Sequence, residues 1–299
     1  MNYAILLSGG VGTRISSEIP KQYIKVNGQM MVTAALKTLL SAPQVDAVCI
    51  VADPSWQGAI LQDLREGDAD EAASMTGNPG NPIRKPLFFA AQGKNRQLSI
   101  WNGLQQILRE KELRREIMGQ VSLPVKEAAG SPVTHAGAGA DDRDRVEMAS
   151  ASGGVEPQTG DSLSSSEPDT VFIHDAARPY LAQPLIDACY AALPGHDGVL
   201  PVLPMKDTVY ESADGRSIDR LLDRSRIFAG QAPELFLFDK YVEANKALLP
   251  DKILLINGST EPAILAGMDI VMIPGDEKNQ KVTTNADMEK FREFAGVHA

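Results

Sequence analysis

The chain has 299 residues and a formal net charge of −10, with 43% hydrophobic residues. This length suits one large or two ordinary domains, and the hydrophobic share is typical of a globular protein. The acidic balance argues against general binding to nucleic acid or an anionic membrane surface, so an anionic substrate would need a local cationic pocket.

The first apolar run, Tyr3 to Leu7, is long enough for a buried strand and stops at a glycine-rich turn. Glycine reaches positive φ without strain and lets the backbone approach a ligand closely. Such a turn after a strand presents backbone N–H groups to phosphate oxygens, and two cations follow it, Arg14 and Lys21. A Walker A loop is excluded because no Gly-Lys-Ser/Thr follows, and the Gly9-x-x-Gly12 spacing does not match a dinucleotide fingerprint. A tight strand-to-helix turn without a ligand is the remaining alternative.

The order strand, G-G-x-G-T-R and P-K-Q-Y resembles the family of 2-C-methyl-D-erythritol 4-phosphate and ribitol-5-phosphate cytidylyltransferases. The resemblance implies that the loop wraps the triphosphate of CTP and that Arg14 and Lys21 are catalytic. The nucleotide-binding residues that it implies in this loop are Ser8, Gly9, Gly10, Gly12 and Thr13.

Strands and helices alternate in the next hundred residues. Residues 32–40 have apolar positions at helical spacing, 45–52 form a near-continuous apolar strand, and 55–64 form a second helix. Residues 66–86 are predicted as a loop and 86–91 as a third strand. This alternation predicts an α/β fold, and the resemblance narrows it to a Rossmann-like three-layer sandwich with a mostly parallel twisted sheet and a protruding β-hairpin dimerisation arm.

A G-x-x-R-x-x-S element opens the helix after the third strand. Gly93, Arg96 and Ser99 match the related enzymes, in which this element faces the cytosine and ribose, so the resemblance assigns them to nucleotide binding. Lys94 departs from the acidic or small residue usual there. The helix is expected to run through Leu108 and to continue over 110–115.

Residues 119–168 interrupt this pattern. The stretch is rich in Gly, Ala, Ser and Asp and has no lasting periodicity, so it cannot bury enough apolar surface to offset its chain entropy. We interpret it as a disordered insertion in a single nucleotidyltransferase domain, 1–299, with a regulatory or partner-binding role as an alternative.

The strand 170–173 ends in H-D-A-A-R-P, which matches the second signature of the family. A carboxylate at the carboxyl end of a parallel strand lines the usual ligand crevice and can hold Mg²⁺ beside substrate phosphates. By resemblance, Asp175 binds Mg²⁺, Ala176 contacts the nucleotide and Arg178 binds the acceptor. His174 is interpreted as an orienting or core residue. Arg178 alternatively forms a structural ion pair.

The last third of the chain carries the remaining acceptor residues. Residues 198–204 form a strand that its prolines place near a sheet edge. Residues 205–226 resemble the arm of the family, which reaches into the second subunit of a homodimer, so Thr208 and Arg224 are expected to contact the acceptor phosphate. Lys281 lies in an N-x-K-x-T element and takes the same role by resemblance. A second metal ligand from 257–262 or 276–279 stays open.

The resemblance implies a cytidylyltransferase of isoprenoid biosynthesis that transfers CMP from CTP to a polyol phosphate of the 2-C-methyl-D-erythritol 4-phosphate type. A cytoplasmic location is expected, because the sequence shows neither a signal-peptide pattern nor an apolar run of about 18 residues. Ribitol 5-phosphate or another alditol phosphate is an alternative acceptor, because Ala232 and Glu234 depart from the Q-T-P-Q-x-F segment of the family and Ser259-Thr260-Glu261 departs from its T-D-D/E stretch. A sugar-1-phosphate nucleotidyltransferase and a nucleotide-binding sensor without catalysis are the alternative functions. Cys49 and Cys189 lie in apolar surroundings and indicate no disulfide framework or metal site.

Overall fold

The computed structural model describes residues 1–10, 19–74, 85–121 and 167–297. Contacts divide the chain into two units, Met1–Leu113 with Glu167–Ala299, and Arg114–Ser166. The described part of the second unit is the continuation of one helix through Val121. The expected insertion otherwise lies outside the described residues, and no helix of the described part is long and apolar enough to cross a bilayer.

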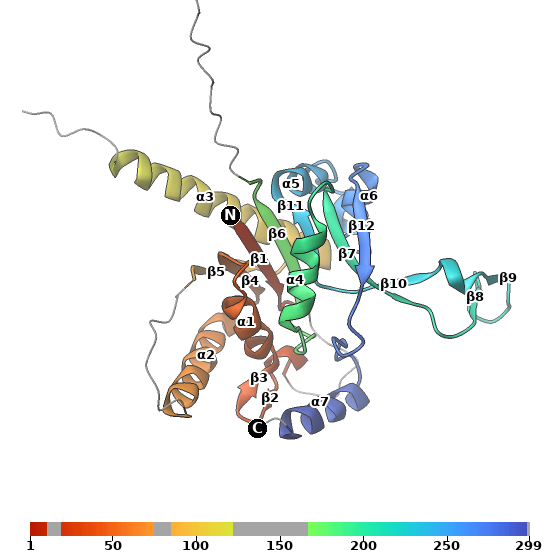
Figure 1. The fold of residues 1–299 in the computed structure, drawn as a ribbon, viewed down its shortest axis with the longest axis horizontal. Coiled ribbons are helices and arrows are strands. Elements are labelled where there is room, and N and C mark those ends of the chain that lie inside the picture. Colours follow the sequence, from red (N-terminus) through yellow and green to blue (C-terminus); the bar gives the residue numbers. More distant parts are fainter. Residues whose placement is uncertain (11–18, 75–84, 122–166, 298–299) are drawn as a thin grey trace, which may run out of the picture. The chain divides into compact units, whose positions relative to one another are not determined.

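The first unit is built on an eight-stranded sheet (Figure 1). Its order is β10-β7-β11-β6-β1-β4-β5, and β12 also pairs with β7. The strands are β1 (Asn2–Leu7), β4 (Ala47–Ala52), β5 (Leu87–Ala91), β6 (Thr170–Asp175), β7 (Gly198–Pro204), β10 (Phe228–Gly230), β11 (Glu234–Leu237) and β12 (Ile270–Pro274). The pairs β1–β4, β1–β6, β4–β5 and β7–β12 are parallel, whereas β10 and β11 run antiparallel to their neighbours.

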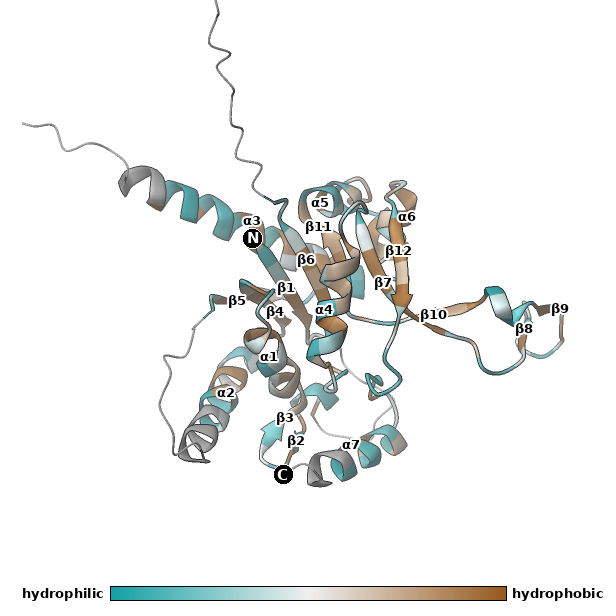
Figure 2. Cartoon of the chain, in the orientation of Figure 1, coloured by the Kyte–Doolittle hydropathy of each residue, from teal (hydrophilic) through white to brown (hydrophobic). Residues whose placement is uncertain are grey.

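Helices cover both faces of the sheet and make the three layers that the sequence predicts. One core cluster joins the sheet to α1 (Met31–Ser41), α2 (Pro54–Ser74) and α4 (Gln183–Ala192). The other joins it to α3 (Arg96–Val121), α5 (Phe238–Lys246), α6 (Glu261–Leu265) and the short 3-10 helix η3 (Lys252–Leu255). Because both faces are covered, the central strands are buried and mainly hydrophobic (Figure 2).

Smaller elements complete the frame of the site. The 3-10 helix η1 (Lys21–Tyr23) precedes a hairpin of β2 (Lys25–Val26) and β3 (Gln29–Met30). Its turn residues Asn27 and Gly28 have φ of 51° and 82°, the positive values that a two-residue hairpin turn requires. The last helix, α7 (Asn285–Val297), packs Met288 and Phe291 against Val26.

A second hairpin leaves the sheet between β7 and β10 (Figure 1). It consists of β8 (Val209–Glu211) and β9 (Arg220–Leu222), with the 3-10 helix η2 (Arg224–Arg226) after it. This hairpin falls within residues 205–226, where the sequence predicts an arm. Tyr210, Ile218 and Leu221 are all more than half exposed on it.

One local prediction is wrong. Residues 66–74, predicted as a loop, continue α2, because a run of charged residues is compatible with the outer turns of a helix. The strand β7 lies next to the edge strand β12, which agrees with the predicted position near a sheet edge, and β10 and β11 pair with its other side. Its Pro201 is tolerated because it falls in the break between the β11 and β10 ladders, where its carbonyl accepts from the N–H of Gln231 at 2.9 Å.

Candidate active site

The glycine-rich segment follows the carboxyl end of β1. The N–H of Ser8 still belongs to the sheet and donates to the carbonyl of Val51 at 2.8 Å, and Gly9 and Gly10 then line a cavity. A Cβ on Gly9 would lie 2.6 Å from the Cβ of Gln92, so a larger residue does not fit there. Gly12, Thr13 and Arg14 lie outside the described residues.

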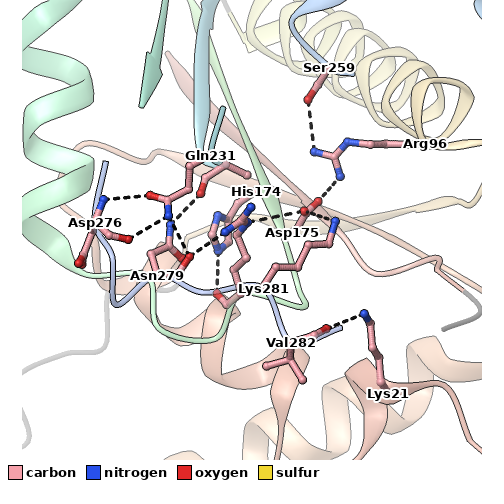
Figure 3. A network of polar contacts seen from close by, with 12 residues as sticks. Lys21, Arg96, His174, Asp175, Gln231, Ser259, Asp276, Asn279, Lys281 and Val282 are labelled. Carbon is pink, nitrogen blue, oxygen red and sulfur yellow. Dashed lines mark hydrogen bonds and ion pairs between the residues drawn. The ribbon is translucent and has the colours of Figure 1, made fainter. Parts of the chain in front are cut away.

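Lys21 reaches the same cavity from η1. Its side chain is largely buried, and its Nζ donates to the carbonyl oxygen of Val282 at 2.6 Å (Figure 3). The N–H of Val282 donates to the carbonyl of Ala177 at 2.8 Å. One peptide segment therefore joins Lys21 to the loop that follows β6.

Asp175 ends β6 and lies between three cationic side chains (Figure 3). Arg96 Nη1 contacts its Oδ1, Lys281 Nζ lies 2.9 Å from its Oδ2, and Arg178 Nε lies 3.9 Å from the same oxygen. Burial opposes ionisation of Asp175, but the charges of Arg96 and Lys281 outweigh it and hold the pKa of Asp175 well below its usual range. Asp175 is therefore ionised and forms ion pairs with the surrounding cationic side chains.

His174 stabilises the turn that follows Asp175. It is fully buried, and burial lowers its pKa to about 4, so the imidazole is neutral at pH 7. Its Nε2 lies 2.9 Å from the carbonyl oxygen of Arg178, which can only accept, so Nε2 is the protonated nitrogen. The geometry agrees with the orienting role expected for this histidine.

A buried amide network braces the loop that carries Lys281 (Figure 3). Arg178 Nη1 donates to the carbonyl of Asn279 at 2.7 Å, and Asn279 Nδ2 donates to the carbonyl of Ala232 at 2.7 Å. Gln231 Nε2 donates to the carbonyl of Asp276 at 2.9 Å. The segment before β11 thus holds the loop before α7, which fixes the backbone from which Lys281 extends.

The G-x-x-R-x-x-S element forms the start of α3. The N–H of Gly93 donates to Ser99 Oγ at 2.9 Å, and Asn95 Oδ1 accepts from the N–H of Leu98 at 2.8 Å, as a helix N-cap does. Arg96 Nη2 lies 3.3 Å from Ser259 Oγ, so Arg96 is held from both ends, by Ser259 and by Asp175.

These elements surround a cavity of about 440 Å³. Eight of the predicted site residues line it: Gly9, Gly10, Lys21, Gly93, Arg96, Ser99, Asp175 and Lys281. The lining also includes Leu7, Gln22, Gln92, Lys94, Asn95, Ala177 and Thr283, to which the sequence assigned no role. In this lining the positive charges exceed the single carboxylate of Asp175. An acidic chain therefore has a cavity suited to a polyanion.

Other predicted residues lie outside this lining. Ser8 and Ala176 are buried behind it, and the N–H of Ala176 donates to the carbonyl of Leu7 at 2.9 Å. Thr208 and Arg224 are exposed on the hairpin, where Arg224 Nη1 donates to the carbonyl of Lys206 at 2.8 Å. A second cavity, of about 470 Å³ between α3 and α5, has a mainly apolar lining that does not suit an anion.

Sequence reasoning missed the residues that hold the site from behind. Gln22 and Tyr23 stood in the quoted P-K-Q-Y motif without a role. Ser259 and Glu234 had no role assigned to them, although Ser259 Oγ lies 3.3 Å from Arg96 Nη2. Burial raises the pKa of Glu234, whose Oε2 has no hydrogen-bond partner in the described structure.

The described residues contain no cluster of three or more His, Cys, Asp or Glu side chains able to hold a metal ion. Asp175 is the one carboxylate of the cavity lining. Mg²⁺ commonly binds through one or two carboxylates and substrate phosphates. The donor set therefore fits an ion carried mainly by the phosphates of a substrate and does not fit a site made by protein ligands alone.

Comparison with known proteins gives a consistent set of similarities. The family model described as 2-C-methyl-D-erythritol 4-phosphate cytidylyltransferase (IspD) matches residues 3–115 and 158–294. A protein of that name from Lachnospira eligens is 26% identical, over 97% of this chain and 96% of its own length. The bifunctional enzyme IspD/IspF of Maricaulis maris is 26% identical over 96% of this chain but only 55% of its own length, so the chain spans about half of that relative.

Solved structures show the same fold. The 4-diphosphocytidyl-2C-methyl-D-erythritol synthase of Anaerococcus prevotii superposes with a TM-score of 0.62 at 17% identity, covering 99% of this chain and 96% of that one. The 2-C-methyl-D-erythritol 4-phosphate cytidylyltransferase of Thermus thermophilus gives a TM-score of 0.57 at 16% identity and covers 97% of both chains.

Proposed function

The chain belongs to the 2-C-methyl-D-erythritol 4-phosphate cytidylyltransferase (IspD) family, and from this premise we propose that it transfers CMP from CTP to 2-C-methyl-D-erythritol 4-phosphate. The products are pyrophosphate and a CDP-alcohol. The names of relatives such as the Lachnospira eligens protein support this acceptor.

One observation carries the proposal: Lys21, Arg96 and Lys281 meet in a single cavity beside Gly9 and Gly10. These residues lie far apart in the sequence and come from four different segments. Backbone amides and cations gathered at the carboxyl ends of β1 and β6 are the features that a nucleoside triphosphate requires. The cavity is also large enough for a small ligand.

The chemistry asks for alignment and charge stabilisation more than for proton transfer. A phosphate oxygen of the acceptor attacks the α-phosphorus of CTP, and the bond to pyrophosphate breaks. The nucleophile is already an anion, so no strong general base is required, and preorganised cations reduce the repulsion between the two anions. We assign this stabilisation to Lys21, together with Arg14.

We assign Lys281 and Arg178 to the acceptor phosphate. Lys281 lines the cavity and is held 2.9 Å from Asp175, so its position is fixed before the acceptor arrives. Arg178 is less exposed and contacts Asp175 and the carbonyl of Asn279, which supports a role in fixing the acceptor loop.

We assign the cytidine end of CTP to the start of α3, with Gly93, Arg96 and Ser99 as contacts and Ala176 shaping the pocket. Lys94 brings an additional exposed cation to this end of the cavity. The ammonium group of Lys94 can only donate hydrogen bonds, so it can contact the base only at an acceptor atom. Any donor group of the base would have to be recognised by a backbone carbonyl of the protein instead.

We propose Mg²⁺ as the metal and Asp175 as its protein ligand. When bound, the ion would neutralise part of the triphosphate charge. Because Arg96 and Lys281 engage the two oxygens of Asp175, at least one of these contacts must loosen for the carboxylate to bind a metal.

We further propose a homodimer that forms through the hairpin of β8 and β9. Its exposed hydrophobic side chains, Tyr210, Ile218 and Leu221, support a contact with a second copy. Thr208 and Arg224 do not line the cavity of their own chain, so we assign them to the acceptor site of the partner. The family match leaves out the stretch between residues 115 and 158, which supports a single domain with an insertion within 119–168.

The proposal is tested by pyrophosphate release from CTP with a panel of acceptors: 2-C-methyl-D-erythritol 4-phosphate, ribitol 5-phosphate and glycerol 3-phosphate. We expect release with the first acceptor and a strict requirement for a divalent metal. Release only with ribitol 5-phosphate would reassign the acceptor. CTP binding without release for any acceptor would support a nucleotide sensor.

A further inference from the structure

We propose that Gln22, supported by Tyr23, is a positioning residue that turns the carbonyl oxygens of the glycine-rich loop away from the nucleotide phosphates. The inference rests on the proposed function, since it concerns how CTP is held. Gln22 Nε2 donates to the carbonyl of Ser8 at 2.8 Å and to the carbonyl of Gly10 at 2.8 Å. Tyr23 Oη donates to the Ser8 carbonyl at 2.7 Å.

The orientation of the Gln22 amide follows from its partners. Both partners are carbonyl oxygens, which only accept, so the –NH₂ end of the amide must face them. Gln22 is 3% exposed, which means that water does not replace these hydrogen bonds. Because this buried amide donates both of its N–H groups to carbonyls of one loop, it stabilises the backbone conformation of that loop.

The planarity of the peptide bond converts this contact into a phosphate site. In a trans peptide the C=O of one residue and the N–H of the next point in opposite directions. Holding the Ser8 carbonyl towards Gln22 and Tyr23 therefore directs the N–H of Gly9 to the opposite side. Gly9 and Gly10 both line the cavity, where amide hydrogens attract phosphate oxygens and carbonyl oxygens would repel them.

Tyr23 makes the arrangement rigid. Its ring stacks on Trp56 at 4.3 Å between centroids, with an interplanar angle of 13°. The ring is buried, so its hydroxyl is presented to Ser8 from a fixed position. Lys21, Gln22 and Tyr23 are consecutive in η1, and this short helix thus delivers a cation and two loop-orienting donors together.

The test compares Gln22→Met with the wild-type protein. Methionine keeps the length of the side chain and removes both donors. Affinities for cytidine, CMP, CDP and CTP are measured by calorimetry at one ionic strength, and the free proteins are compared by thermal unfolding. Gln62→Met, which changes an exposed glutamine of α2, is the matched control, and Tyr23→Phe removes one of the two donors to Ser8.

We expect the affinity of Gln22→Met for CTP to fall about 10-fold to 100-fold, with a smaller loss for CDP and none for cytidine. Tyr23→Phe should show the same dependence on phosphate number with a smaller amplitude, and Gln62→Met should match the wild type. An equal loss for all four ligands, or unchanged CTP affinity in a folded Gln22→Met protein, would overturn the inference. Failure of the wild type to bind CTP would instead refute the proposed function.

Discussion

Replacing Asp175 with asparagine tests the idea that one carboxylate organises the site. The substitution keeps the size of the side chain and removes the charge that faces Arg96, Lys281 and Arg178. Removing one partner of a buried ion pair typically lowers stability by about 3–5 kcal/mol, because the other charge stays buried without compensation. Lys281 is 39% exposed and can be solvated, so we expect the lower end, about 3 kcal/mol.

The assay is urea unfolding of the wild type and of the Asp175→Asn variant between pH 3 and pH 8, with pyrophosphate release measured on the same samples. Because the pKa of Asp175 is lowered in the folded state, its stabilising contribution is fully present above the usual aspartate pKa of about 3.9 and is lost as the pH falls below it. The difference in unfolding free energy should therefore be constant from pH 6 to pH 8 and shrink below about pH 4.

Asp63 provides a matched control for this experiment. It is also buried, lies 2.8 Å from Lys25 Nζ and accepts from the N–H of Met30 at 2.9 Å, but it does not line the cavity. Asp63→Asn should lower stability and leave the turnover of the folded protein intact, whereas Asp175→Asn should lose both. Equal stability of Asp175→Asn and the wild type across this pH range would refute the reasoning.

Other predictions test single contacts of the site and the hairpin. Lys21→Met should raise the barrier of pyrophosphate release by about 3–5 kcal/mol, and near-normal turnover of the folded variant would exclude a catalytic role. Lys281→Met should raise KM for the acceptor about 10-fold to 100-fold and change KM for CTP little, as initial rates with either substrate varied would show. Burial lowers the pKa of His174 to about 4, so the folded state resists its protonation. The free energy of unfolding should therefore fall by about 3 kcal/mol as the pH falls from about 6.5 to 4. In urea unfolding, His174→Gln should reduce the dependence of this free energy on pH. Leu221→Asp should weaken self-association in sedimentation experiments, and a wild type that sediments as a monomer would contradict the proposed dimer.

The sequence predicts the frame of this fold because its signals are local. Near-continuous apolar runs identify β1, β4 and β6, since strands covered on both faces need no alternation. Sheet order is not local, so the prolines of β7 could predict a position near a sheet edge but not which strands pair with it. Pro201 lies between the part of β7 that pairs with β11 and the part that pairs with β10. This break in the pairing cannot be read from the sequence of β7.

The candidate site divides in the same way. Its charged residues were predicted through motifs, and the structure places Lys21, Arg96, Asp175 and Lys281 around one cavity. The supporting contacts could not be predicted, because main-chain carbonyls carry them: the oxygen of Val282 for Lys21 and that of Asn279 for Arg178. Every residue has a main-chain carbonyl, so the amino-acid type does not show which residue accepts such a hydrogen bond.

The reversed direction of β11 has a consequence for how such a site can diverge. The segments that follow the parallel strands lie at one end of the sheet. Because β11 is antiparallel, the segment that precedes it lies at the same end. Gln231 and Ala232 reach the loop that carries Lys281 in this way, on a connection separate from the turn after β1. On the proposed function, a substitution at Ala232 would alter the support of the acceptor site and leave the turn that contacts CTP unchanged.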